Sequence, residues 1–122
     1  MERVLITGAT GRIGTAFRRY VGNRYRLRLG VHDPAKLDDP EGHEVVKLEL
    51  ADQVSCAEAC EGIDTVVHMA ANPSPRAEFY DGLLESNIKG PYNILKAAKE
   101  MGCRRVVLGS SVQAVAGYPL AV

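Results

Sequence analysis

The chain has 122 residues, of which 46% are hydrophobic and 25% are charged, and its formal net charge at pH 7 is zero. This length suits one modest domain, so residues 1–122 are treated as a single unit. No basic stripe indicates a nucleic-acid partner, and the apolar runs are too short to span a membrane. Met1 leads directly into an apolar run without a signal-peptide layout, so we expect a cytoplasmic protein.

Strand-like and helix-like segments alternate along the chain. Apolar, β-branched runs predict strands over residues 3–7, 26–31, 44–50, 63–69 and 105–109. Helices are predicted over residues 12–21, 53–60 and 77–101, with a kink or a break at Gly90 and Pro91. The apolar residues that recur at helical spacing in the first helix are Ile13, Ala16, Phe17 and Tyr20. Residues 33–42, rich in acids and prolines, predict a loop or a broken turn of helix.

This alternation favours an α/β fold with a parallel sheet that is covered on both faces. Right-handed crossovers then predict a doubly wound, Rossmann-type sheet with strand order 3-2-1-4-5. Ligands of such sheets bind outside the carboxyl ends of the strands, and each motif described below falls at such an end.

The three cysteines are Cys56, Cys60 and Cys103. The first two are four residues apart in a predicted helix, which could place their thiols side by side. Without neighbouring histidines or further cysteines, small apolar filler is a better interpretation than a metal site. Free thiols are typical of a reducing compartment.

A glycine-rich loop, Gly8-Ala9-Thr10-Gly11-Arg12-Ile13-Gly14, links the first strand to the first helix. Gly8 permits the tight turn, Gly11 has no Cβ to obstruct a phosphate, and Gly14 lets the helix pack closely on the sheet. A glycine triplet alone fits any turn that needs a positive φ, but the position between a buried strand and an amphipathic helix favours a phosphate site. The backbone N–H groups of the first helical turn, including Arg12 and Ile13, would face the pyrophosphate of NAD or NADP.

These residues resemble the opening of the extended short-chain dehydrogenases/reductases, which include NAD-dependent epimerases, dehydratases and uronate dehydrogenases. Similar stretches follow in order at residues 64–71 (DTVVHMAA), 87–95 (NIKGPYNIL) and 105–111 (RVVLGSS). The resemblance covers the whole chain and implies the N-terminal, NAD(P)-binding portion of a longer family member. The residue pattern of the segment from Ser110 to Pro119 resembles uronate dehydrogenases more than nucleotide-sugar epimerases.

The resemblance also implies cofactor contacts beyond the glycine loop. Asp33, nineteen residues after Gly14, would accept hydrogen bonds from the adenosine ribose and favour NAD, although the nearby His32 and Lys36 are compatible with NADP. Glu49 replaces the family's aspartate beside the adenine, and Leu50 would wall the base. The remaining implied cofactor residues are Met69, Ala70, Ala71 and Asn87, and His68 is interpreted as a buried support of the site.

By the same resemblance, Ser111 is the catalytic serine that polarises the substrate oxygen. Ser110 takes this role if the register slips by one, and an ungapped alignment on Gly117 would put Val112 there. Ser74 and Gln113 are the other candidate substrate contacts. Hydride transfer in the family needs a Tyr-x-x-x-Lys pair after the fifth strand. The match at Tyr92 to Lys96 lies in an earlier helix and is interpreted as chance, so we expect the chain alone to be inactive.

Three functions remain open from the sequence. An NAD-dependent oxidoreductase acting on a sugar or sugar acid is favoured over a nucleotide-sugar epimerase or dehydratase and over a non-enzymatic NAD(P) sensor. The expected partners are a sugar-type small molecule and, in the full-length protein, a second copy of the chain. No nucleic acid, membrane or metal is expected.

Overall fold

Five parallel strands form one sheet with the order β3-β2-β1-β4-β5, as predicted. The computed structural model describes residues 1–117 and residue 119. The strands are β1 (Arg3–Thr7), β2 (Arg26–Val31), β3 (Glu44–Lys47), β4 (Thr65–His68) and β5 (Arg105–Leu108). Because β2 and β4 pair with opposite edges of β1, the winding of the sheet reverses at β1.

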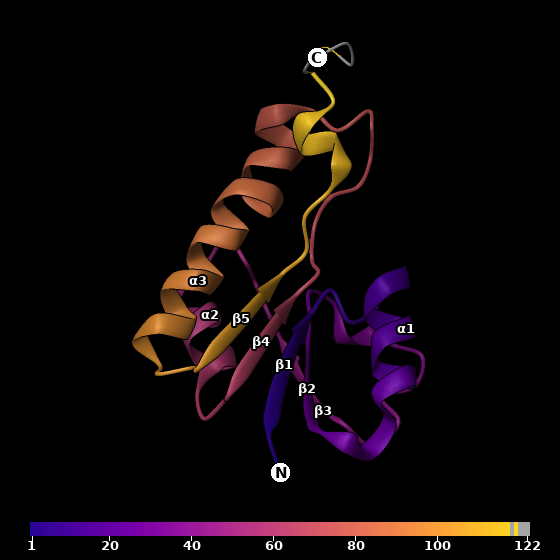
Figure 1. Ribbon diagram of the computed structural model, residues 1–122, viewed down its shortest axis with the longest axis vertical. Helices are drawn as coiled ribbons and strands as arrows, with labels where there is room; N and C mark the ends of the chain where they lie inside the picture. The colour runs from indigo at the N-terminus through magenta and orange to yellow at the C-terminus, as the bar shows by residue number, and fades with distance from the viewer. Residues whose placement is uncertain (118, 120–122) are drawn as a thin grey trace.

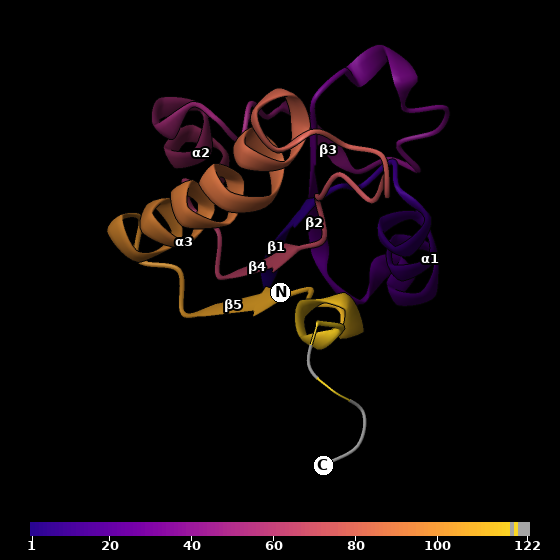
Figure 2. The same ribbon diagram turned by 90° about the horizontal axis from the view of Figure 1, so that it is seen from above.

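Helices cover both faces of the sheet (Figures 1 and 2). Helix α1 (Arg12–Val21) lies on one face, and helices α2 (Gln53–Cys60) and α3 (Gly90–Glu100) lie on the other. Successive residues of β1 supply the two cores in turn: Leu5 packs on the α2–α3 side, and Val4 and Ile6 pack on the α1 side. This two-sided burial explains why β1 is a continuous apolar run without polar alternation.

Strands β3 and β4 are shorter than their apolar runs predicted. The run over residues 44–50 forms a strand only to Lys47, where its partner residue Val31 ends β2. One further bond, from the N–H of Leu48 to the carbonyl of Val31 at 2.8 Å, continues the pairing before the chain turns away. Leu48 and Leu50 therefore belong to a loop at the carboxyl edge of the sheet, and apolarity there reflects burial rather than strand structure.

Of the apolar residues that recur at helical spacing in α1, Phe17 packs on the core, and the other three are exposed. Ile13 is 66% exposed and Tyr20 is 74% exposed, whereas Gly14, Arg18 and Val21 are buried. The guanidinium of Arg18 donates to the backbone carbonyl of Asp39 and lies 3.5 Å from a carboxylate oxygen of Glu41. These contacts offset the cost of burying a charge and tie α1 to the loop that follows β2.

The helix does not break at Gly90 and Pro91, where a kink or a break was predicted, but its bonding changes there from π-helical to α-helical. A π-helical segment, η3 (Phe79–Lys89), continues directly into α3, and Gly90 keeps helical backbone angles (φ −54°, ψ −59°). Pro91 is the second residue of α3 and has no N–H to donate to the preceding turn. A Cβ on Gly90 would lie 3.4 Å from the side chain of Leu50 and from the carbonyl oxygen of Glu85, which is ordinary van der Waals contact.

The cysteines behave as core filler. Cys56 and Cys60 are fully buried between α2 and α3, and all three cysteines are free thiols. Burial raises the pKa of Cys60 to about 12 and that of Cys56 to about 11, so both thiols stay protonated. Within residues 1–117 and 119, no cluster of three potential metal ligands is present, and no helix is long and apolar enough to cross a membrane.

His68 is buried at the carboxyl end of β4 and is 2% exposed. Its Nδ1 lies 2.7 Å from the hydroxyl oxygen of Thr7, the residue opposite it on β1. Burial lowers the pKa of His68 from 6.5 to about 4, which keeps the imidazole neutral near pH 7. The predicted supporting role is consistent with this position, because the pair joins the two central strands next to the carboxyl edge.

The buried histidine predicts a pH dependence of stability. Since its pKa is lower in the folded than in the unfolded chain, protonation favours unfolding. The contribution of His68 should be fully present above about pH 6.5 and fall toward pH 4, by up to about 1.4 kcal/mol per pH unit and about 3 kcal/mol in all. Urea unfolding of the unchanged chain and of His68→Gln at a series of pH values measures it. We expect a flatter profile for the variant, and identical slopes would contradict the assignment.

Candidate functional site

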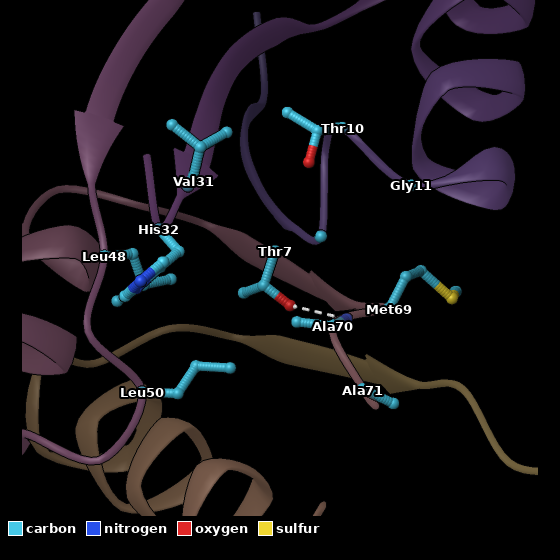
Figure 3. Close-up of a pocket in the computed structure, with 12 residues that line it drawn as sticks. Thr7, Thr10, Gly11, Val31, His32, Leu48, Leu50, Met69, Ala70 and Ala71 are labelled. Atoms are coloured by element: carbon cyan, nitrogen blue, oxygen red, sulfur yellow. Dashed lines mark hydrogen bonds between the residues drawn. The ribbon is translucent and has the colours of Figure 1, made fainter. Parts of the chain in front are cut away.

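A cavity of about 230 Å³ opens at the carboxyl edge of the sheet (Figure 3). It is lined by the glycine loop, the end of β2, the loop after β3 and the segment after β4: Thr7, Gly8, Thr10, Gly11, Gly30, Val31, His32, Leu48, Leu50, Met69, Ala70 and Ala71. This is the point where the winding reverses and where such sheets bind ligands. The cavity is smaller than the roughly 300–1,000 Å³ typical of small-molecule sites, so we expect it to hold part of a larger ligand.

A second hollow, of about 400 Å³, lies at the opposite edge of the sheet. Its lining includes Met1, Arg26 and Glu44, at the amino ends of the strands. Because open α/β sheets bind ligands at their carboxyl edge, we assign the functional site to the first cavity despite its smaller volume.

Two backbone segments meet at the floor of this cavity. Gly8 has a φ of +69°, and a Cβ there would lie 2.8 Å from the backbone nitrogen of Ala70. That N–H donates to the Thr7 hydroxyl at 3.2 Å (Figure 3). Both the turn and the close approach require glycine, as the sequence predicted for the turn. The floor is therefore mainly backbone, which leaves room for a ligand.

The other two glycines of the loop differ in what surrounds them. A Cβ on Gly14 would lie 2.2 Å from the carbonyl oxygen of Gly8 and 2.9 Å from Cα of Ala9, so the close contact that Gly14 permits is between α1 and the loop. Gly11 has an ordinary φ of −72°, and the nearest atom to a Cβ there is the same oxygen at 3.2 Å. A side chain at position 14 would therefore clash with the folded backbone, whereas a Cβ on Gly11 would meet a single atom, the carbonyl oxygen of Gly8.

The start of α1 is suited to an anion. Gly11 precedes the helix without a side-chain cap, and the first turn, from Arg12 onward, contains no acidic residue. The N–H of Thr15 is already bonded to the carbonyl of Gly11 at 2.9 Å. The earlier N–H groups have no carbonyl within the helix to bond, and the positive end of the helix dipole adds to their attraction for phosphate. The side chains of Arg12 and Ile13 are exposed, and neither is among the described residues that line the cavity.

Of the residues implied for the adenosine end of the cofactor, some line the cavity and others lie beside it. Leu50 lines the cavity, whereas Asp33 lies just outside the lining and caps a short turn by accepting the N–H of Ala35 at 3.1 Å. His32, which precedes Asp33, lies on the rim, with its Nδ1 3.0 Å from a carboxylate oxygen of Glu49. The acid and the histidine thus lie at the same end of the cavity but have different partners.

The side chain of Asn87 is not among the described residues that line the cavity, but it holds the loop after β4. Its side-chain oxygen accepts the N–H of Asn72 at 2.7 Å, and its amide NH₂ donates to the carbonyl of Asn72 at 3.1 Å. On the same helix, the buried amide of Asn93 donates to the carbonyl of Leu50 at 2.7 Å. The two amides thereby hold the loops that follow β4 and β3. Asn93 was not predicted as a site residue, although the N-x-x-G-x-x-N spacing carries both asparagines.

The implied substrate residues lie on exposed segments. Ser111 accepts the N–H of Gln113 at 3.2 Å and caps the short helix η4 (Val112–Val115). Ser74 accepts the N–H of Arg76 at 3.2 Å in the loop after β4. None of Ser74, Ser111 and Gln113 is among the described residues that line the cavity. Tyr118, in the segment compared with uronate dehydrogenases, lies outside the described residues.

The Tyr-x-x-x-Lys match lies on α3. Tyr92 is exposed there, and Lys96 pairs with Glu100 at 2.6 Å. Neither side chain is among the lining residues of the cavity in the described part of the chain. This placement agrees with the interpretation of the match as chance.

Sequence reasoning identified half of the cavity lining. Gly8, Gly11, Leu50, Met69, Ala70 and Ala71 were predicted; Thr7, Thr10, Gly30, Val31, His32 and Leu48 were not. Gly30 carried a usable signal, because glycine inside a buried strand indicates close approach of a neighbour. A Cβ on Gly30 would lie 2.8 Å from a methyl carbon of Leu48.

Comparison with known proteins assigns nearly the whole chain to one family. The sequence model of the NAD dependent epimerase/dehydratase family matches residues 4–120. NAD-dependent glucose-6-phosphate dehydrogenase of Haloferax volcanii is 33% identical over 121 residues, which cover 96% of this chain and 46% of that protein. Uronate dehydrogenase of Agrobacterium fabrum is 33% identical over 119 residues, covering 98% and 44%. The chain spans less than half the length of these relatives.

Solved structures agree with these relatives. A mutated uronate dehydrogenase has a TM-score of 0.85 at 33% identity, with 97% of this chain and 42% of that chain covered. A variant of uronate dehydrogenase from Agrobacterium tumefaciens, complexed with NAD, has a TM-score of 0.78 at 35% identity, with 91% and 41% covered.

The packing around the glycine loop predicts that replacing glycine by alanine lowers the free energy of unfolding by different amounts at positions 14 and 11. Gly14→Ala should lower the free energy of unfolding by about 1–3 kcal/mol, because its methyl group overlaps the carbonyl of Gly8. Gly11→Ala, the matched control, should cost less than about 1 kcal/mol, since its backbone angles suit alanine. Urea unfolding of the two variants tests this, and equal losses would show that α1 does not rest on the loop as described.

Proposed function

The chain belongs to the NAD-dependent epimerase/dehydratase family, and from this premise we propose that it forms the cofactor-binding part of an NAD-dependent oxidoreductase acting on a sugar or sugar acid. One observation carries the proposal: the cavity at the winding reversal has a floor of bare backbone next to an uncapped helix start. That combination supplies space and N–H donors for two linked phosphates.

The residues present fit a nicotinamide dinucleotide. The pyrophosphate would be held by the backbone N–H groups of Arg12 and Ile13, since that of Gly11 is bonded to Gly8, and the missing side chain of Gly11 would let it approach. Gly8 and Gly14 would keep the loop and α1 in contact. Leu50 would wall the adenine and Asp33 would accept from the ribose. Met69, Ala70 and Ala71 would border the phosphates, and Asn87 would act by holding Asn72. When bound, NAD supplies the acceptor for a hydride from substrate carbon, and this chain binds and orients it.

The substrate class is proposed from the relatives. The names of the similar dehydrogenases specify glucose-6-phosphate, L-arabinose and uronate, all of them sugars or sugar derivatives. We therefore propose an aldose or a uronic acid as substrate, with Ser111 donating a hydrogen bond to the reacting oxygen. Its hydroxyl accepts from Gln113, which leaves its own proton free to donate. Ser74 and Gln113 remain candidates for the other hydroxyl groups of the sugar.

A second candidate is favoured by the name of the family. Epimerases and dehydratases return the hydride to the same molecule, so they use NAD without releasing NADH. The assay uses the full-length protein that contains this chain, with NAD and a panel of free aldoses, uronates and nucleotide sugars. Accumulation of NADH supports the dehydrogenase, and conversion of a nucleotide sugar without net NADH would replace it by the second candidate.

Cofactor binding can be tested on the chain itself. Gly11→Val should weaken NAD binding by at least about tenfold in calorimetric titration, because the side chain occupies the approach of the phosphates. Gly117→Val is the matched control, since a Cβ at that exposed glycine meets nothing within 4 Å. Thermal unfolding of both variants checks that they are folded. Unchanged affinity in Gly11→Val, or failure of the folded chain to bind either NAD or NADP, would overturn the proposed function.

A further inference from the structure

Three charged or titratable side chains form a row across the ends of β2 and β3. Nδ1 of His32 lies 3.0 Å from one carboxylate oxygen of Glu49, and Nζ of Lys47 lies 3.7 Å from the other. His32 is on the rim of the cavity, close to Leu48 in Figure 3, and its side chain is 81% exposed. Ion pairs as exposed as these contribute little to folding stability. Their consequence lies in the charge and orientation that they give to the rim.

This row of side chains determines the charge and the hydrogen-bonding groups that the rim presents to a ligand. Glu49 is the shared partner of the two basic side chains His32 and Lys47, so its negative charge opposes theirs. Asp33 adds a second carboxylate, which uses one oxygen to cap the turn at Ala35 and keeps further acceptor positions. A ribose hydroxyl can donate to such a carboxylate. A phosphate monoester would instead meet two carboxylates and would have to compete with Glu49 for His32.

We propose that Glu49 is a specificity-determining residue that disfavours a 2′-phosphorylated dinucleotide by holding His32. The inference rests on the proposed binding of a nicotinamide dinucleotide and adds a residue to it. Glu49 acts here on the histidine of the neighbouring strand end, whereas the acid that favours NAD by direct contact is Asp33. Asp33 then attracts the ribose hydroxyl, and Glu49 withdraws the ring nitrogen of His32 from a phosphate.

Four forms of the chain test the proposal: unchanged, Glu49→Gln, His32→Gln and the double variant. Affinities for NAD and NADP are measured by calorimetric titration at low salt, where charge effects are largest. Glu49→Gln should raise the affinity for NADP about fivefold, because His32 becomes free to pair with the phosphate, and should change that for NAD less than about twofold. In the His32→Gln background, the same substitution should change the NADP affinity less than about twofold.

The control removes an equivalent carboxylate elsewhere. Glu100 pairs with Lys96 on α3 and is comparably exposed, so Glu100→Gln makes the same charge change in a different ion pair, at the last residue of α3. It should leave the NADP-to-NAD affinity ratio unchanged. An unchanged ratio in Glu49→Gln would overturn the proposal, and so would a gain that persists in full without His32, since Glu49 would then act only through its own charge. Failure of the folded, unchanged chain to bind either nucleotide would instead overturn the proposed function itself.

Discussion

The closeness of three backbone segments around Gly8 is the constraint on which the site depends. The carbonyl of Gly8 accepts the N–H of Gly11 at 3.0 Å and occupies the space that a Cβ on Gly14 would need. On its other side, the Cα of Gly8 faces the backbone of Ala70. The turn, the start of α1 and the segment after β4 are thus packed against one peptide unit, which makes the direction of the helix dipole and the floor of the cavity consequences of the same contact.

The elements near this contact were also the easiest to predict. The bounds of β1, α1, β2 and α2 agree with the sequence, because each has local signals: a buried apolar run, a glycine turn or a capping acid. The buried face of α1 was not predictable from apolar spacing. Arg18 is buried through its bonds to Asp39 and Glu41, some twenty residues away, and side-chain hydropathy does not encode such partners. Likewise, Gly90 was interpreted as the site of a kink or a break, although the helix runs through it with helical backbone angles.

The candidate site shows a similar division. Motif residues in the glycine loop and after β4 were found because their spacing is local and their resemblance to a family is strong. Thr7 and Leu48 were missed because they reach the cavity only through pairings between distant segments, as in the bond from Ala70 to Thr7 across 63 residues. Asn87 was selected from the resemblance as a cofactor residue, and its amide contacts the backbone of Asn72 in the loop after β4.

The helix formed by η3 and α3 links loops that are remote in sequence. Asn87 and Asn93 lie on either side of the change from π-helical to α-helical bonding, and they hold Asn72 and Leu50 respectively. A shift of that junction along the helix would rotate one amide relative to the other and pull on one loop alone. Exchanging only the loop after β4 between relatives, without the helix that holds it, would therefore be poorly tolerated. The loop and its supporting helix therefore form one structural unit, because the amide of Asn87 is positioned to meet the backbone of Asn72.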